Sequence, residues 1–72
     1  MLIYQGQWDD WKEGNRFAFR STVKKAKSDC ERAEQEWTGS AIEWEEVSGD
    51  KNIKWRGNTK YHRFLIHQYE VK

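Results

Sequence analysis

The sequence predicts a small α+β fold, in which one amphipathic helix packs on one face of a small antiparallel sheet in the chain order β-β-α-β-(β)-β. Three observations predict this fold: segments that alternate between apolar and polar residues, one segment with apolar residues at helical spacing, and short turn signals between them. The chain, residues 1–72, is long enough for a single domain. Five Trp, three Tyr and three Phe give this polar chain large side chains to bury.

The first 20 residues predict a β-hairpin. Residues 1–8 alternate between apolar and polar side chains, and residues 16–20 alternate again, with Phe17 and Phe19 on one face. The polar residues 9–15 connect these two strands. One face of the first strand carries Leu2, Tyr4 and Trp8.

Residues 22–37 have the spacing of an amphipathic helix. Apolar residues recur at steps of three and four: Val23, Ala26, Cys30, Ala33 and Trp37. Thr22 is the candidate N-cap and Gly39 is a stop signal. We expect this apolar stripe to pack with Trp44 and Leu65, and the tryptophan ring at its C-terminal end to be fully buried.

The rest of the chain predicts three more strands: residues 41–47, residues 53–55 and residues 60–71, with turns at residues 48–52 and 57–59. Ile42 and Trp44 share one face of the first of these strands. The pattern leaves open whether residues 53–56 form a regular strand. The last strand has apolar side chains on both faces, which predicts a central position in the sheet.

The charges are segregated along the chain, although the formal net charge is only +1. Residues 12–27 hold six basic side chains and one acid, residues 29–50 hold eight acids and one base, and residues 51–72 hold six bases and one acid. The bases of the predicted helix lie in its first half and the acids in its second, which opposes the helix macrodipole. This arrangement indicates either a two-signed surface that matches a partner or a solvated helix face.

The sequence predicts no catalytic, cofactor or metal site. It contains no glycine-rich phosphate loop and no CxxC, HExxH or GxSxG motif. His62 and His67 are five residues apart on a predicted strand, so they face opposite sides and cannot bind one metal ion together. Cys30 is expected to be a packed thiol, and a single cysteine indicates a reducing, cytoplasmic location. No apolar run approaches the roughly 20 residues that cross a bilayer.

The main hypothesis for the function is a non-catalytic protein-binding module, either monomer or homodimer. Exposed strand edges permit β-strand addition, and large rings in loops and edges serve as anchors. The candidate contact residues are Asp9, Asp10, Trp11, Glu43, Glu45, Glu46 and Trp55. The acids among them suit a basic groove on the partner, such as one that normally holds nucleic acid. The opposing interpretation is that these acids pair with cations on neighbouring strands.

The alternative function is direct nucleic-acid binding by a small accessory protein. Basic residues alternate with aromatic residues in two stretches, which suits phosphate contact and base stacking. The candidate contacts are Arg20, Lys24, Lys27, Lys54, Arg56 and Arg63. The sequence pI of about 7.9 is lower than that of most dedicated nucleic-acid binders, which exceeds about 9.

Several short motifs resemble those of small proteins encoded by bacteriophages and prophages. They are the hairpin that runs into Phe19-Arg20-Ser21-Thr22, the lysine-rich helix with Ala26, the strand Ile42-Glu43-Trp44-Glu45-Glu46-Val47 and the ending Tyr69-Glu70-Val71. The resemblance covers most of the chain in layout and assigns no site residue. It implies a phage-type inhibitor, of the anti-CRISPR class, that occludes a surface of a host or defence protein in the cytoplasm of a bacterial host cell.

Overall fold

The computed structural model describes residues 1–9 and 15–71 and confirms the α+β fold. Its elements in chain order are β1 (Leu2–Asp9), β2 (Asn15–Arg20), α1 (Val23–Trp37), β3 (Glu43–Glu46), β4 (Ile53–Asn58) and β5 (Arg63–Glu70). The fourth strand is therefore regular. The helix prediction is confirmed, because Thr22 is the N-cap and its hydroxyl accepts a hydrogen bond from the Lys25 amide at 3.2 Å.

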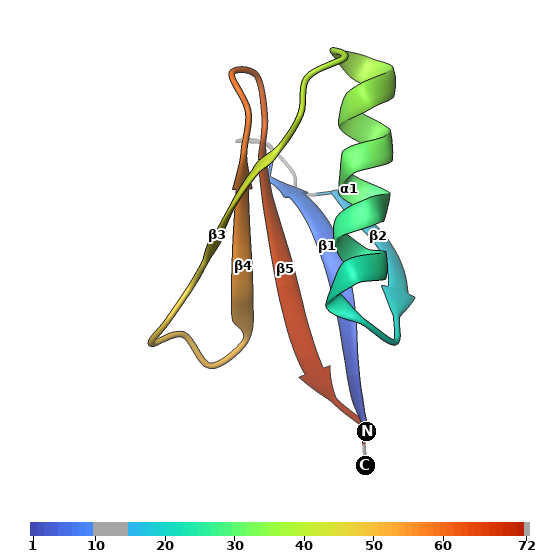
Figure 1. Ribbon diagram of the computed structural model, residues 1–72. Helices are drawn as coiled ribbons and strands as arrows, with labels where there is room; N and C mark the ends of the chain where they lie inside the picture. The colour runs from blue at the N-terminus through green and yellow to red at the C-terminus, as the bar shows by residue number, and fades with distance from the viewer. Residues whose placement is uncertain (10–14, 72) are drawn as a thin grey trace.

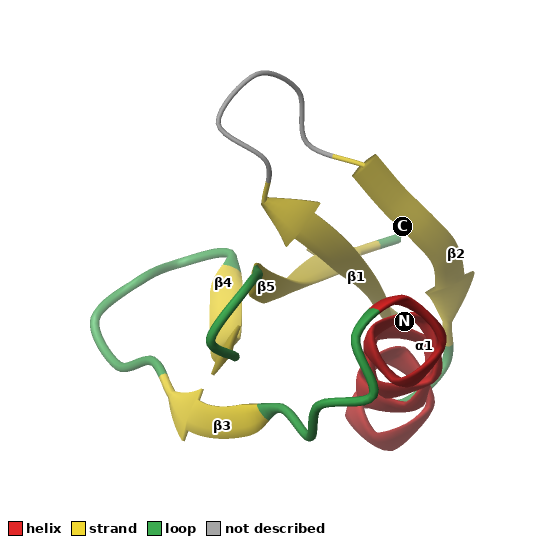
Figure 2. Ribbon diagram, turned by 90° about the horizontal axis from the view of Figure 1, so that it is seen from above, coloured by secondary structure: helices red, strands yellow, loops and turns green. Residues whose placement is uncertain are grey.

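The five strands form one antiparallel sheet in the order β2-β1-β5-β4-β3. β5 is the central strand, as its two apolar faces predicted. The sheet curls so that its strands follow an arc, and α1 lies across the open side of this arc between β2 and β3 (Figure 1, Figure 2). The core lies inside the arc. We call the face turned away from α1 the outer face; no other described element covers it.

The core combines small helix residues with aromatic rings from the sheet. Its buried hydrophobic residues are Ala26, Cys30, Ile42, Phe64 and Ile66, and the rings packed against them belong to Tyr4, Trp8, Phe17, Trp44 and Trp55. A Cβ atom at Gly6 would lie 2.6 Å from Cys30 Sγ and 3.2 Å from the Ala26 carbonyl oxygen. Only glycine therefore allows α1 to lie this close to β1.

A β-bulge separates two phenylalanines that the alternation placed on one face. The register of β1 and β2 shifts just after Gln5, where Phe17 and Ala18 both lie opposite Gly6. Phe17 packs against the core, whereas Phe19 is 58% exposed on the outer face. The prediction of a shared face is wrong because the bulge adds one residue to β2. The Gln5 side chain donates to the Phe17 carbonyl at 2.8 Å, where the ladder is interrupted.

Two further predictions about the core are wrong. Phe64 and Ile66 face α1, so Leu65 lies half-buried on the outer face. Alternation could not choose between them, because both faces of β5 are apolar. Trp37 is 46% exposed because it is the last residue of α1 and packs at the margin of the core, with its ring centroid 4.6 Å from that of Trp8.

The turn predicted at residues 57–59 lies at residues 59–62 instead, so β4 ends and β5 begins later than expected. Thr59 forms this turn, because its hydroxyl accepts hydrogen bonds from the amides of Tyr61 and His62 at 3.1 and 2.8 Å. A hydroxyl that satisfies two amides of a tight turn stops the strand more effectively than the glycine that precedes it.

Adjacent residues of β5 test which face carries the core. Phe64→Ala removes a fully buried ring and should lower the free energy of unfolding by about 3–5 kcal/mol, most of what a domain of this size has. Leu65→Ala, on the outer face, should cost less than about 2 kcal/mol. Urea denaturation monitored by tryptophan fluorescence measures both values. A larger loss for the leucine variant would contradict this assignment of the faces.

Candidate functional site

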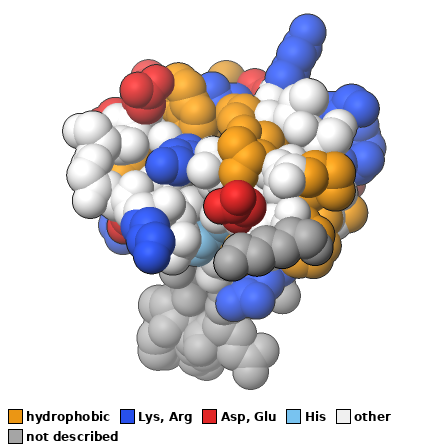
Figure 3. Space-filling view, turned by 90° about the horizontal axis from the view of Figure 1, so that it is seen from below, with side chains coloured by type: hydrophobic (Ala, Val, Ile, Leu, Met, Phe, Trp, Pro, Cys, Tyr) orange, Lys and Arg blue, Asp and Glu red, His pale blue; other side chains and the backbone are white. Residues whose placement is uncertain are grey.

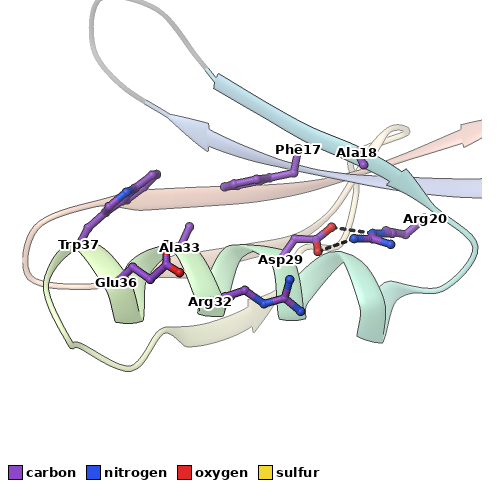
Figure 4. A pocket seen from close by; sticks show the side chains of 8 residues that line it. All are labelled: Phe17, Ala18, Arg20, Asp29, Arg32, Ala33, Glu36 and Trp37. Atoms are coloured by element: carbon purple, nitrogen blue, oxygen red, sulfur yellow. Dashed lines mark hydrogen bonds and ion pairs between the residues drawn. The ribbon is translucent and has the colours of Figure 1, made fainter.

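A groove between β2 and α1 is the candidate binding site (Figure 4). Its volume is about 370 Å³, and it is open to solvent. One wall is β2, an edge strand whose outer side has no partner strand among the described residues. The lining side chains are Phe17, Ala18, Arg20, Asp29, Arg32, Ala33, Glu36 and Trp37.

An ion pair joins the two walls at one end of the groove. Arg20 Nε lies 2.8 Å from Asp29 Oδ2, and Arg20 Nη2 lies 2.9 Å from Asp29 Oδ1, so the pair is bidentate (Figure 4). The hydrogen bonds and the charge of Asp29 raise the pKa of Arg20. Arg32 and Glu36 are exposed and form no ion pair among the described residues, so they remain as the charged groups for a ligand.

Trp37 forms the opposite end of the groove (Figure 4). Its ring packs on Trp8 and lies edge-on to His62, with ring centroids 5.5 Å apart in the second pair. Phe17 and Ala33 lie between the ion pair and this ring. The groove therefore has an apolar middle, a half-exposed ring at one end and charges of both signs along the helix.

A buried carboxylate links α1 to the β4–β5 turn. Glu34 is fully buried, its Oε1 lies 2.6 Å from His62 Nδ1, and its Oε2 accepts the Thr59 hydroxyl at 2.5 Å. The sequence analysis placed this residue in the acidic half of the helix and missed the cluster. A signal was present, because Glu34 follows Cys30 by four residues and precedes Trp37 by three, which is the spacing of the buried stripe.

The hydrogen bonds of Glu34 keep its carboxylate charged despite burial. Burial alone would raise the pKa of Glu34, but hydrogen bonds from Thr59 and His62 and the charge of His62 outweigh it, so the pKa is lowered. A carboxylate bound to imidazole Nδ1 also orients histidines in catalytic sites. Here, however, the Thr59 hydroxyl donates to the carboxylate and not to the imidazole, so the pair holds no hydroxyl ready for activation.

The acidic candidates from the sequence lie apart from the groove. Glu43, Glu45 and Glu46 are exposed on β3, the edge strand opposite β2. Glu45 pairs with Arg56 across the strands at 3.4 Å, a weak exposed contact, so the cross-strand alternative applies to one of these acids. Residues 10 and 11, that is Asp10 and Trp11, and the side chain of Asp9 lie outside the described residues.

The basic candidates are distributed over several surfaces. Lys27 lies over the Trp55 ring, with Nζ 3.3 Å from the ring centroid, and Trp55 packs against the core rather than projecting as a free anchor. Lys24 is exposed on α1, and Lys54 is half-buried on β4. Three other candidates have clear positions: Arg20 in the groove, and Arg56 and Arg63 on the outer face.

Comparisons with protein-family models, with curated proteins and with solved structures gave no match for this chain. Among the described residues, no helix has both the length and the apolar character needed to cross a membrane. The same residues contain no group of three or more His, Cys, Asp or Glu side chains placed to hold a metal ion. The function is therefore inferred from the surfaces of the molecule.

The Cys30 thiol should be unreactive in the folded protein. Burial, and then the charges of Asp29 and Glu31, raise the pKa of Cys30 to about 12. We expect no reaction with an aromatic disulfide reagent near pH 8, at which a free thiol reacts readily, and full reaction after unfolding in guanidinium. Absorbance of the released thiolate measures both. Rapid reaction of the folded protein would show that the thiol is accessible.

Stability in acid should depend on Glu34. Because its pKa is lower in the folded state than the unfolded value of about 4.3, its stabilisation is present above that value and is lost as the pH falls through the folded pKa. Glu34→Gln should therefore flatten the loss of unfolding free energy below about pH 4.5, measured by urea denaturation. Glu36→Gln, at an exposed position of the same helix, should keep the wild-type slope; equal flattening would contradict the assignment.

Proposed function

We propose that this protein is a non-catalytic protein-binding module that holds an extended segment of its partner in the groove between β2 and α1. The observation that carries the proposal is the unpaired outer edge of β2 beside an open groove. A peptide strand can pair with such an edge through its backbone, and its alternate side chains then enter the groove.

The walls of the groove indicate which partner segment fits. Arg32 and Glu36 offer one charge of each sign along α1, and Trp37 offers a half-exposed ring at the end. A segment with an acidic residue, a basic residue and an apolar residue at alternate positions complements these three groups. The bulge and the arginines of β2 oppose pairing with a second identical edge, which favours a heterologous partner.

The resemblance to phage-encoded inhibitors extends this proposal. A partner segment held in the groove is withdrawn from its own contacts, so binding occludes a surface of a host or defence protein in the bacterial cytoplasm. This step rests on the resemblance alone. The exposed acids of β3, Glu43, Glu45 and Glu46, supply a second, electrostatic contact to a basic surface of the same partner.

Filling the groove tests the proposal. Ala33→Arg places a long side chain in the middle of the groove at a helix position that tolerates it. The tagged protein should capture a stoichiometric partner from nuclease-treated bacterial lysate. The affinity for that partner, once purified and measured by calorimetry, should fall at least about tenfold in the variant, as when a well-packed contact is lost.

Ala41→Arg is the matched control, because Ala41 is exposed in the connection between α1 and β3 and does not line the groove. It adds the same charge and should leave the affinity unchanged. Thermal melting of both variants verifies that they are folded. Equal affinity of both variants for the partner, or recovery of nucleic acid without protein, would overturn the proposal.

A further inference from the structure

The outer face of the sheet has an ordered arrangement of side chains that the groove does not use. The register aligns these residues in rows, about 7 Å apart along the strands. From the end at which the termini lie, the rows are Ile3 and Tyr69; then Phe19, Gln5, His67 and Ile53; then Arg16, Gln7, Leu65, Arg56 and Glu45; then Arg63, Asn58 and Glu43. Aromatic rings thus occupy one half of the face and arginines the other.

Three rings form a continuous platform in the first two rows. Tyr69 and His67 are stacked, with centroids 6.0 Å apart and planes 15° apart, and Phe19 meets Tyr69 edge-on at 5.7 Å. Phe19 is more than half exposed although it neighbours two other rings. Seen from the end at which the termini lie, hydrophobic side chains reach the surface with lysines, arginines and a few acids around them (Figure 3).

The imidazole of His67 belongs to this platform as a neutral ring. Burial, and then the positive charge of Arg16, lower the pKa of His67, while the charge of Asp50 opposes this effect. A neutral ring between Tyr69 and the arginine row adds flat aromatic surface without adding charge. It therefore extends the area available for stacking.

Arginines dominate the charge of the second half of the face. Arg16 and Arg56 lie in one row on β2 and β4, and Arg63 lies in the next row on β5. The carboxylates of this face are confined to the edge strand β3, and the one ion pair among them, between Glu45 and Arg56, is exposed and 3.4 Å long. A phosphate can replace so weak a partner, because an exposed pair contributes little.

We propose that the outer face binds single-stranded nucleic acid, with bases stacked on Phe19 and Tyr69 and the sugar-phosphate backbone running over the arginines. An exposed sheet surface with aromatic rings and cations is a surface on which unpaired bases can stack. The face is the convex side of a curled sheet, which suits a flexible strand rather than a stiff duplex (Figure 2). This site goes beyond the groove, which lies on the other side of β2.

Fluorescence anisotropy with a fluorescein-labelled oligothymidylate of about 15 nucleotides tests the proposal. Three phosphate contacts should give a slope of log K against log salt of about −2, since each contributes about −0.7 on a single strand. Arg16→Ala and Arg56→Ala should each reduce this slope by about one third. Phe19→Leu, which keeps the apolar volume but removes the ring, should weaken binding by about fivefold to a hundredfold.

Controls separate the face from the rest of the charge. Lys24→Ala and Lys25→Ala remove exposed cations from α1 and should leave affinity and slope unchanged. Ala33→Arg should retain binding, so that failure of the groove and failure of this face are distinguishable. The proposal is overturned by any of three results: no binding at about 50 mM salt, equal losses in the α1 variants, or equal affinity for a duplex of the same length. Capture of a protein by this face that Phe19→Leu abolishes, with no oligonucleotide bound, would assign the face to a protein partner instead.

Discussion

The close approach of α1 to β1 at Gly6 is the constraint on which the rest of the structure depends. Because no side chain stands between the strand and the helix there, the Cys30 thiol and the Ala26 backbone lie against the sheet. The extra residue of the bulge in β2 lies opposite this glycine, and the bulge turns Phe17 into the space beside the helix. The same bulge leaves Phe19 on the outer face. One missing side chain thus determines how the core is filled, where the groove begins and which ring is exposed.

The unusual charge order of α1 is explained by contacts with the sheet. Its first turn has no acid and its last turn has no base, so several charges oppose the helix macrodipole at a cost of about 0.3–1 kcal/mol each. Three of these charges have partners outside the helix. Lys27 lies over Trp55, Asp29 binds Arg20, and Glu34 binds the β4–β5 turn. They join α1 to β4, to β2 and to the start of β5, which is how a short helix closes the open side of a curled sheet.

The sequence was sufficient to predict the elements and insufficient to predict how they meet. The helix and the strands follow from periodicity, which is a local property of the chain. The bulge at Phe17 adds a single residue, which a two-residue period cannot reveal. Leu65 was assigned to the core because β5 is apolar on both faces, so the choice of face depended on the position of α1. The burial of Glu34 could be suspected from its spacing, but its partners lie 25 and 28 residues away in a turn whose position depends on Thr59.

β2 serves the groove and the outer face at once, and the bulge is the physical reason. Residues that enter the groove or the core, Phe17 and Arg20, and residues that reach the outer face, Arg16 and Phe19, come from the same strand of six residues. In an unbroken strand, Phe17 and Phe19 would share one face, and either the core would lack a ring or the outer face would lose its exposed one. A ligand in the groove pairs with the free edge of β2, whereas a strand on the outer face contacts side chains that point away from that edge. The two sites are therefore neighbours without overlapping, and occupancy of one leaves the other open.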